Sequence, residues 1–132
     1  MLALLIVPMM IACSDDDDAT GISADMAGTY TLRTINGQNL PFAVINQPGH
    51  TLEVTADQYV LNADGSFNST VSFRETENGT VTTSTDTYSG TWQRSGSTIT
   101  LSSADYGLES ATFSGGNTLT FTSGPNSAVY RK

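Results

Sequence analysis

Few side chains in this sequence could perform acid–base or nucleophilic chemistry. The only histidine, His50, follows a Gln-Pro-Gly stretch, and the only cysteine is Cys13. A histidine- and cysteine-based metal site needs several such side chains, and a Ser-His-Asp triad needs a histidine beside an activated serine. We therefore expect His50 to lie in an exposed loop, and we expect no metal site, no cofactor and no catalytic residue.

Two groups of polar residues resemble functional sites only loosely. Glu75, Glu77 and Asp86 flank an Asn-Gly turn, whereas a glycosidase carboxylate pair must be buried about 5–9 Å apart. The alternating polar residues of the segment 62–68 resemble a calcium loop, but Gly65 comes too early and no distal glutamate follows. We expect a hairpin turn at Gly65 and predict that the protein is not an enzyme.

Cys13 offers a different chemistry, because it directly follows an uninterrupted apolar run at residues 1–12. This run is shorter than the roughly 20 apolar residues that span a bilayer, and it has the length of a signal-peptide core. The alternative is a buried N-terminal strand or helix that carries an ordinary buried cysteine. No amphipathic period supports that alternative.

Four consecutive aspartates, residues 15–18, follow the cysteine and supply half of the formal net charge of −8. Adjacent carboxylates repel one another and stay hydrated, so residues 13–27 should form a disordered acidic tether. The five Lys and Arg residues are scattered. Nucleic-acid binding requires a basic surface, and this composition therefore argues against it.

From Gly28 onward, short alternating apolar and polar runs are separated by turn signals such as Asn36-Gly37, Asp64-Gly65 and Asn78-Gly79. Residues 38–45 contain Pro41 and should form an edge or irregular segment. The other runs predict strands at residues 28–35, 50–55, 57–63, 66–75, 80–94, 97–103, 107–113, 118–123 and 127–132. Eight or nine hairpin-linked strands indicate a small antiparallel up-and-down β-barrel; the alternative is a β-sandwich.

The alternation also predicts which side chains point inward. They are Tyr30, Leu32, Tyr59, Leu61, Phe67, Val71, Phe73, Trp92, Ile99, Leu101, Phe113, Leu119 and Phe121. Such a set could line a pocket for a small apolar ligand, or it could fill the barrel completely. The many aromatic rings favour the filled core, whereas an open mouth would make Tyr59, Trp92 and Phe73 the candidate ligand contacts.

Two segments resemble known families. Residues Met10-Ile11-Ala12-Cys13 are similar to a bacterial lipobox, which implies cleavage after Ala12 and lipid attachment to Cys13. Ser14 and the aspartates resemble the export signal of surface lipoproteins in Bacteroidota-type bacteria. This resemblance implies an outer-membrane lipoprotein, with either the periplasmic face or the cell surface as its location.

The second resemblance covers residues 28–132. The Gly28-Thr29-Tyr30 sequence lies where lipocalins carry a Gly-x-Trp motif, and Tyr130-Arg131 ends the last strand as in lipocalins. The domain therefore resembles bacterial lipocalin-like lipoproteins, which implies that Tyr30 and Arg131 form a pair that closes the barrel.

Together these observations predict three parts: a signal peptide at residues 1–12, a lipidated tether at 13–27 and a lipocalin-like barrel at 28–132. Its partners would be the membrane, through the lipid on Cys13, and a small hydrophobic ligand. The alternative is a structural or protein-interaction lipoprotein with a filled core, an unknown protein partner and no ligand.

Overall fold

The computed structural model describes residues 24–132, which form a single antiparallel sheet of ten strands after a short 3-10 turn, η1 (Ala24–Met26). Eight strands close into a barrel, because β1 (Gly28–Ile35) pairs with both β10 (Asn126–Arg131) and β4 (His50–Leu61). The remaining barrel strands are β5 (Ser66–Glu77), β6 (Thr80–Ser95), β7 (Thr98–Ser103), β8 (Gly107–Ser114) and β9 (Thr118–Ser123). The predicted antiparallel barrel is confirmed. The β-sandwich alternative is wrong, because the β1–β4 pairing closes the sheet on itself.

The predicted hairpin turns connect these strands. Asn78 and Gly79 both adopt positive φ angles, 50° and 85°, as a two-residue turn between β5 and β6 requires. Asn36 and Gly37 do the same, at 52° and 76°, between β1 and the short strand β2 (Gln38–Asn39). Asn-Gly pairs suit these turns because both residues tolerate the left-handed conformation.

The barrel interior is filled by the side chains that the alternation predicts. Nine of the thirteen predicted inward residues are buried, and the other four, Val71, Phe73, Phe113 and Phe121, are half-buried and pack against them. Met26, Val54, Ala111 and Tyr130 are also buried, although the alternation did not single them out. Trp92, Tyr30 and Phe67 are the largest fully buried side chains.

Residues 50–61 differ from expectation, because they form one strand instead of two. Strand β4 runs through the predicted break, and a register shift between Val54 and Ala56 absorbs the extra residue Thr55 as a bulge. His50 therefore begins a strand and does not lie in a loop. The inward positions change from even-numbered residues, such as Val54, to odd-numbered ones, such as Tyr59 and Leu61, across the bulge. This change of phase is the reason that the sequence pattern predicts two strands.

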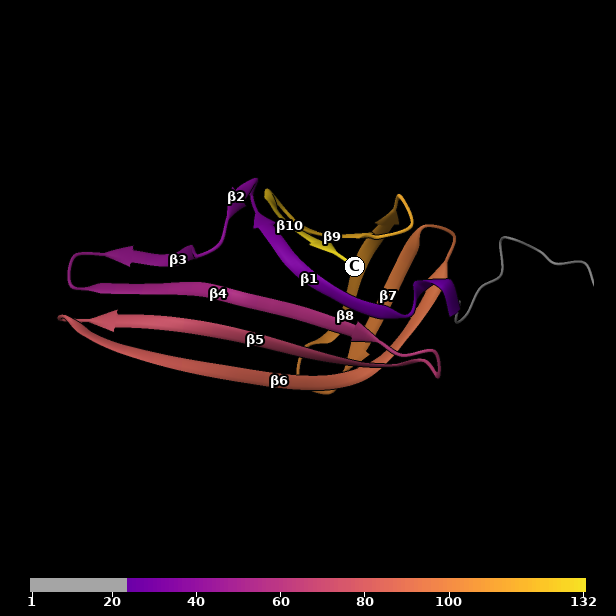
Figure 1. Ribbon diagram of the computed structural model, residues 1–132, viewed down its shortest axis with the longest axis horizontal. Helices are drawn as coiled ribbons and strands as arrows, with labels where there is room; N and C mark the ends of the chain where they lie inside the picture. The colour runs from indigo at the N-terminus through magenta and orange to yellow at the C-terminus, as the bar shows by residue number, and fades with distance from the viewer. Residues whose placement is uncertain (1–23) are drawn as a thin grey trace, which may run out of the picture.

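Part of the sheet extends beyond the closed barrel. Figure 1 shows β3 (Phe42–Gln47) and the long strands β4, β5 and β6 reaching leftward, away from the shorter strands β7 to β10. β6 pairs with β5 along nearly its whole length, but it pairs with β7 only from Gly90 to Ser95. We call this four-stranded part, residues 42–55, 72–77 and 80–89, the sheet extension. Its outer strands are β3 and β6.

Candidate functional site

The candidate ligand contacts lie in different surroundings. Trp92 is only 1% exposed, and its ring Nε1 donates a hydrogen bond to the carbonyl oxygen of Asn62 at 2.9 Å. Tyr59 is 4% exposed and stacks on Phe121 with ring centroids 5.0 Å apart. Phe73 is half-buried on the sheet extension, where it pairs with Val54. The structure therefore does not bring the three together on one open surface, and their role in binding stays a prediction.

Tyr30 and Arg131 are also not brought together. The register places Arg131 opposite Thr31, and neighbouring residues of a strand point to opposite faces of the sheet. Tyr30 therefore points into the core, where its hydroxyl donates to the carbonyl oxygen of Met26 at 2.7 Å, while Arg131 is exposed. A different cation, Arg94, lies 5.9 Å from the ring centre of Phe113, which in turn packs edge-on against Tyr30.

Three tyrosines and two carboxylates meet at the end of the barrel that continues into the sheet extension. The hydroxyls of Tyr59 and Tyr88 are 2.6 Å apart, and both lie near Oε2 of Glu109, at 3.5 and 3.3 Å. The Tyr130 hydroxyl donates to Oδ2 of Asp57 at 2.7 Å. We call Asp57, Tyr59, Tyr88, Glu109 and Tyr130 the tyrosine–carboxylate cluster.

Burial gives this cluster unusual protonation behaviour. Desolvation raises the pKa of Asp57 to about 6, although hydrogen bonds from Tyr130 and from the Gln58 amide, and the nearby Ser69 hydroxyl, oppose the shift. Burial also raises the pKa of Tyr59 and Tyr130. The phenols therefore stay neutral and act as hydrogen-bond donors.

Two buried polar atoms in this region have no hydrogen-bond partner. They are Oδ1 of Asp57 and Oγ of Ser69. The Ser69 hydroxyl lies close enough to Asp57 and Tyr88 to oppose the rise in the pKa of both groups. It does not form a hydrogen bond of good geometry with either group. Buried polar groups without a partner are uncommon and usually mark a bound water or a functional position. The alternation of β4 and β5 could have indicated both residues, since each is polar at a predicted inward position.

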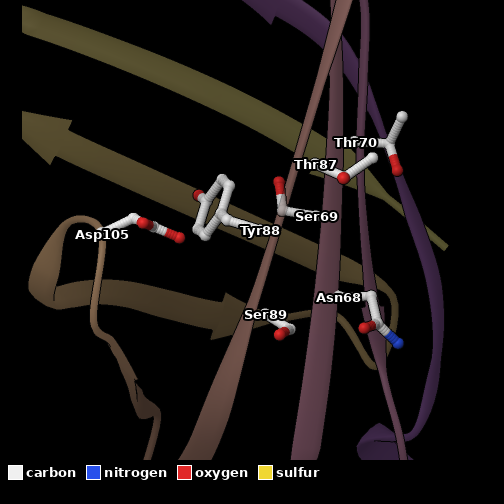
Figure 2. A pocket seen from close by; sticks show the side chains of 7 residues that line it. All are labelled: Asn68, Ser69, Thr70, Thr87, Tyr88, Ser89 and Asp105. Carbon is white, nitrogen blue, oxygen red and sulfur yellow. The ribbon is translucent and has the colours of Figure 1, made fainter.

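A polar depression lies beside this cluster, where β6 separates from β7. It has a volume of about 460 Å³, and its lining residues are Asn68, Ser69, Thr70, Thr87, Tyr88, Ser89 and Asp105. Figure 2 shows Tyr88 and Ser69 projecting from β6 and β5 toward the loop that carries Asp105. We call this depression the β6 notch. It is lined by hydroxyl, amide and carboxylate groups together with one aromatic ring.

Gly90 allows β6 to approach β7 at the border of the notch. A Cβ atom at this position would lie 1.9 Å from the Ser102 carbonyl oxygen and 2.8 Å from Cε1 of Phe67. The register of β6 with both neighbours is regular at Gly90, so this glycine is a point of close approach and not a bulge. The sequence signal for the notch was the long run of residues 80–94 beside a much shorter following strand.

The remaining candidate groups lie on the sheet extension. His50 Nε2 lies 2.7 Å from Oε1 of Glu75, and Arg74 pairs with Glu53 on the other face of the sheet extension. Within residues 24–132, no cluster of three or more His, Cys, Asp or Glu side chains could hold a metal ion. The same part of the chain contains no helix long and apolar enough to cross a membrane. Cys13 and the aspartates lie outside the described residues.

No family model matches this sequence, and neither a curated protein nor a solved structure matches it significantly. The fold defines the class of the molecule, an antiparallel eight-stranded β-barrel with two additional strands. The resemblance to lipocalin-like lipoproteins stays a prediction.

Proposed function

We propose that this protein is a lipid-anchored outer-membrane lipoprotein that binds a protein partner on the outside of its barrel, at the β6 notch. One observation carries the choice of binding surface. The barrel interior is occupied by its own side chains, with Trp92, Tyr30 and Phe67 at most 1% exposed, whereas the notch is open and lined by polar groups. A filled small barrel leaves recognition to its outer surface.

The position of η1, where the described part of the chain begins, supports the anchoring part of the proposal. Met26 of η1 is buried in the core, and Nζ of Lys132 donates to the Asp25 carbonyl oxygen at 2.8 Å. Figure 1 places this point at the opposite end of the molecule from the hairpin tips of the sheet extension. A lipid on Cys13 would hold the η1 end of the barrel near the membrane, and the sheet extension would then point away from the membrane.

A small hydrophobic ligand is the second candidate, favoured by the apolar face of the sheet extension. Phe73 and Leu52 are half-buried there, and the register places Leu52 beside Ile45 and Phe73 beside Val54. The inward side chains of β4 and β5 continue directly into this face. A ligand on it would contact Phe73 but not the fully buried Trp92.

A photo-cross-linking side chain placed at residue 87 tests the proposal in the native membrane. Thr112 is the matched control, because it is an exposed threonine that points outward from the middle of β8. We expect a discrete protein adduct from position 87, none from position 112, and loss of the partner when Thr87→Trp fills the notch. Equal adducts at both positions would contradict the proposal. The second candidate would be correct instead if the Thr87→Trp variant still bound a small apolar molecule and the Phe73→Ala variant did not.

A further inference from the structure

The two outer strands of the sheet extension are protected to different degrees. Unpaired strand edges invite pairing with other chains, and proteins usually block them with prolines, lysines or bulges. The β3 edge follows this rule, since Pro41 precedes it, Pro48 follows it and a register shift lies between Ala43 and Ile45. Residues 80–89 of β6 contain neither proline nor lysine, and their pairing with β5 is unbroken.

The hairpin turn fixes which backbone groups face outward. A two-residue turn makes its flanking residues, here Glu77 and Thr80, a hydrogen-bonded pair, and such pairs alternate along an antiparallel ladder. The backbone groups of even-numbered β6 residues therefore form hydrogen bonds with β5. The Trp92 amide agrees with this assignment, because it donates to the Gly65 carbonyl oxygen at 2.9 Å. The unpaired amides and carbonyls belong to the odd-numbered residues Val81, Thr83, Thr85 and Thr87.

The charged side chains on the edge strand itself and in the notch are acidic. Asp86 is exposed on β6, and the exposed Asp105 lines the notch at the end of the edge. Arg74 lies on β5 opposite Thr83, but it is paired with Glu53, and Arg94 donates to the Gly96 carbonyl oxygen. A second copy of this acidic chain would bring more negative charge to the edge, whereas a segment that carries Lys or Arg would be attracted to it.

We propose that the β6 edge binds an extended, lysine- or arginine-containing segment of a partner protein as an added strand, with one basic side chain in the β6 notch beside Asp105. This inference rests on the proposed function and specifies its partner. The backbone of the added strand would form hydrogen bonds with the odd-numbered residues of β6, and these bonds would supply affinity. Its alternate side chains would contact the carboxylates of Asp86 and Asp105, and these contacts would supply selectivity. The side chains of Thr87 and Ser89 flank the same notch.

The probe is a synthetic nine-residue peptide of alternating Thr and Lys, compared with the same peptide containing Glu in place of Lys. We expect the Lys peptide to slow the amide exchange of Val81, Thr83, Thr85 and Thr87 at least tenfold, and the Glu peptide to leave it unchanged. Thr85→Pro removes one outward amide and should abolish the effect. Thr85→Val keeps that amide and the side-chain shape, and should preserve it.

Three results would overturn the inference. One is unchanged exchange of the odd-numbered amides with the Lys peptide, and another is an equal effect of the Glu peptide. The third is protection of these amides in the protein alone together with a dimer mass in sedimentation, which would assign the edge to a second copy. If Thr85→Pro leaves the natural partner's adduct at position 87 intact, strand addition is wrong but the proposed function stands.

Discussion

Burial disfavours the charged form of Asp57, whose carboxyl group lies in the tyrosine–carboxylate cluster. Its pKa rises from 3.8 to about 6 in the folded protein, so the native state binds the proton more tightly than the unfolded chain does. The contribution of this group to the free energy of unfolding is therefore largest below about pH 4, falls as the pH rises to about 6, and stays low above that.

Asp57→Asn removes this buried charge, and the amide oxygen of the new side chain can still accept the hydrogen bond from the Tyr130 hydroxyl. We expect the variant to be more stable than wild type at pH 7, by up to about 3 kcal/mol, with the difference closing near pH 4. Urea unfolding at both pH values measures this. A variant that is less stable at pH 7, or a difference that does not change with pH, would show that the Asp57 carboxylate is better solvated than its burial implies.

Gly90 is the residue that determines the path of β6. Gly90→Ala places a methyl group against the Ser102 carbonyl oxygen and Phe67, and both are held in the sheet or the core. We expect a loss of stability of roughly 1–3 kcal/mol, the cost typical of overpacking. Thermal unfolding measures it, with Ser89→Ala as the control on the neighbouring position. Equal stability of the two variants would mean that β7 moves aside without cost.

At the scale of the element, the ladder between β5 and β6 predicts different effects of proline at two adjacent positions. Ser84 bonds to β5 opposite Phe73, whereas Thr85 directs its amide outward. We expect Ser84→Pro to be less stable than Thr85→Pro by at least about 2 kcal/mol, since only the former breaks a ladder hydrogen bond. Guanidinium unfolding of the pair measures the difference. Equal losses would mean that the assigned parity of β6 is wrong.

The sequence predicts most of these elements because turn dipeptides and alternation are local signals. Asn78-Gly79 forms the turn it suggests, and nine of the thirteen predicted inward residues are buried. It could not show that β4 continues through Thr55, because the bulge shifts the alternation by one residue and so looks like a break between two strands. The free edge of β6 was also hidden, since it depends on where β7 ends its pairing and on the closure between β1 and β4. These are non-local contacts.

The candidate site was harder to predict than the fold. Tyr59 and Asp57 belong to β4, but their partners Tyr88, Glu109 and Tyr130 come from β6, β8 and β10, which only the closed barrel brings near one another. The sequence makes Trp92 a candidate ligand contact because a large aromatic ring can bind ligands. In the structure it fills the core and satisfies a backbone carbonyl.

For the whole molecule, we predict a lipid anchor that the folding of the barrel does not require. In protein purified from its native membranes, we expect an intact mass that corresponds to residues 13–132 plus acyl chains. Cys13→Ser should release the protein from the membrane and leave its unfolding temperature unchanged, because several acyl chains supply the membrane affinity. An unmodified mass that includes residues 1–12 would contradict the lipoprotein assignment.

The most direct test of binding at the β6 edge is the amide hydrogen exchange of β6 in the protein without any partner, measured residue by residue by NMR. An open recognition edge requires Val81, Thr83, Thr85 and Thr87 to exchange at least tenfold faster than Thr82, Ser84, Asp86 and Tyr88. That alternation is the result we predict. Uniform protection of both sets would mean that the edge is already covered, and it would contradict binding at the β6 edge and notch.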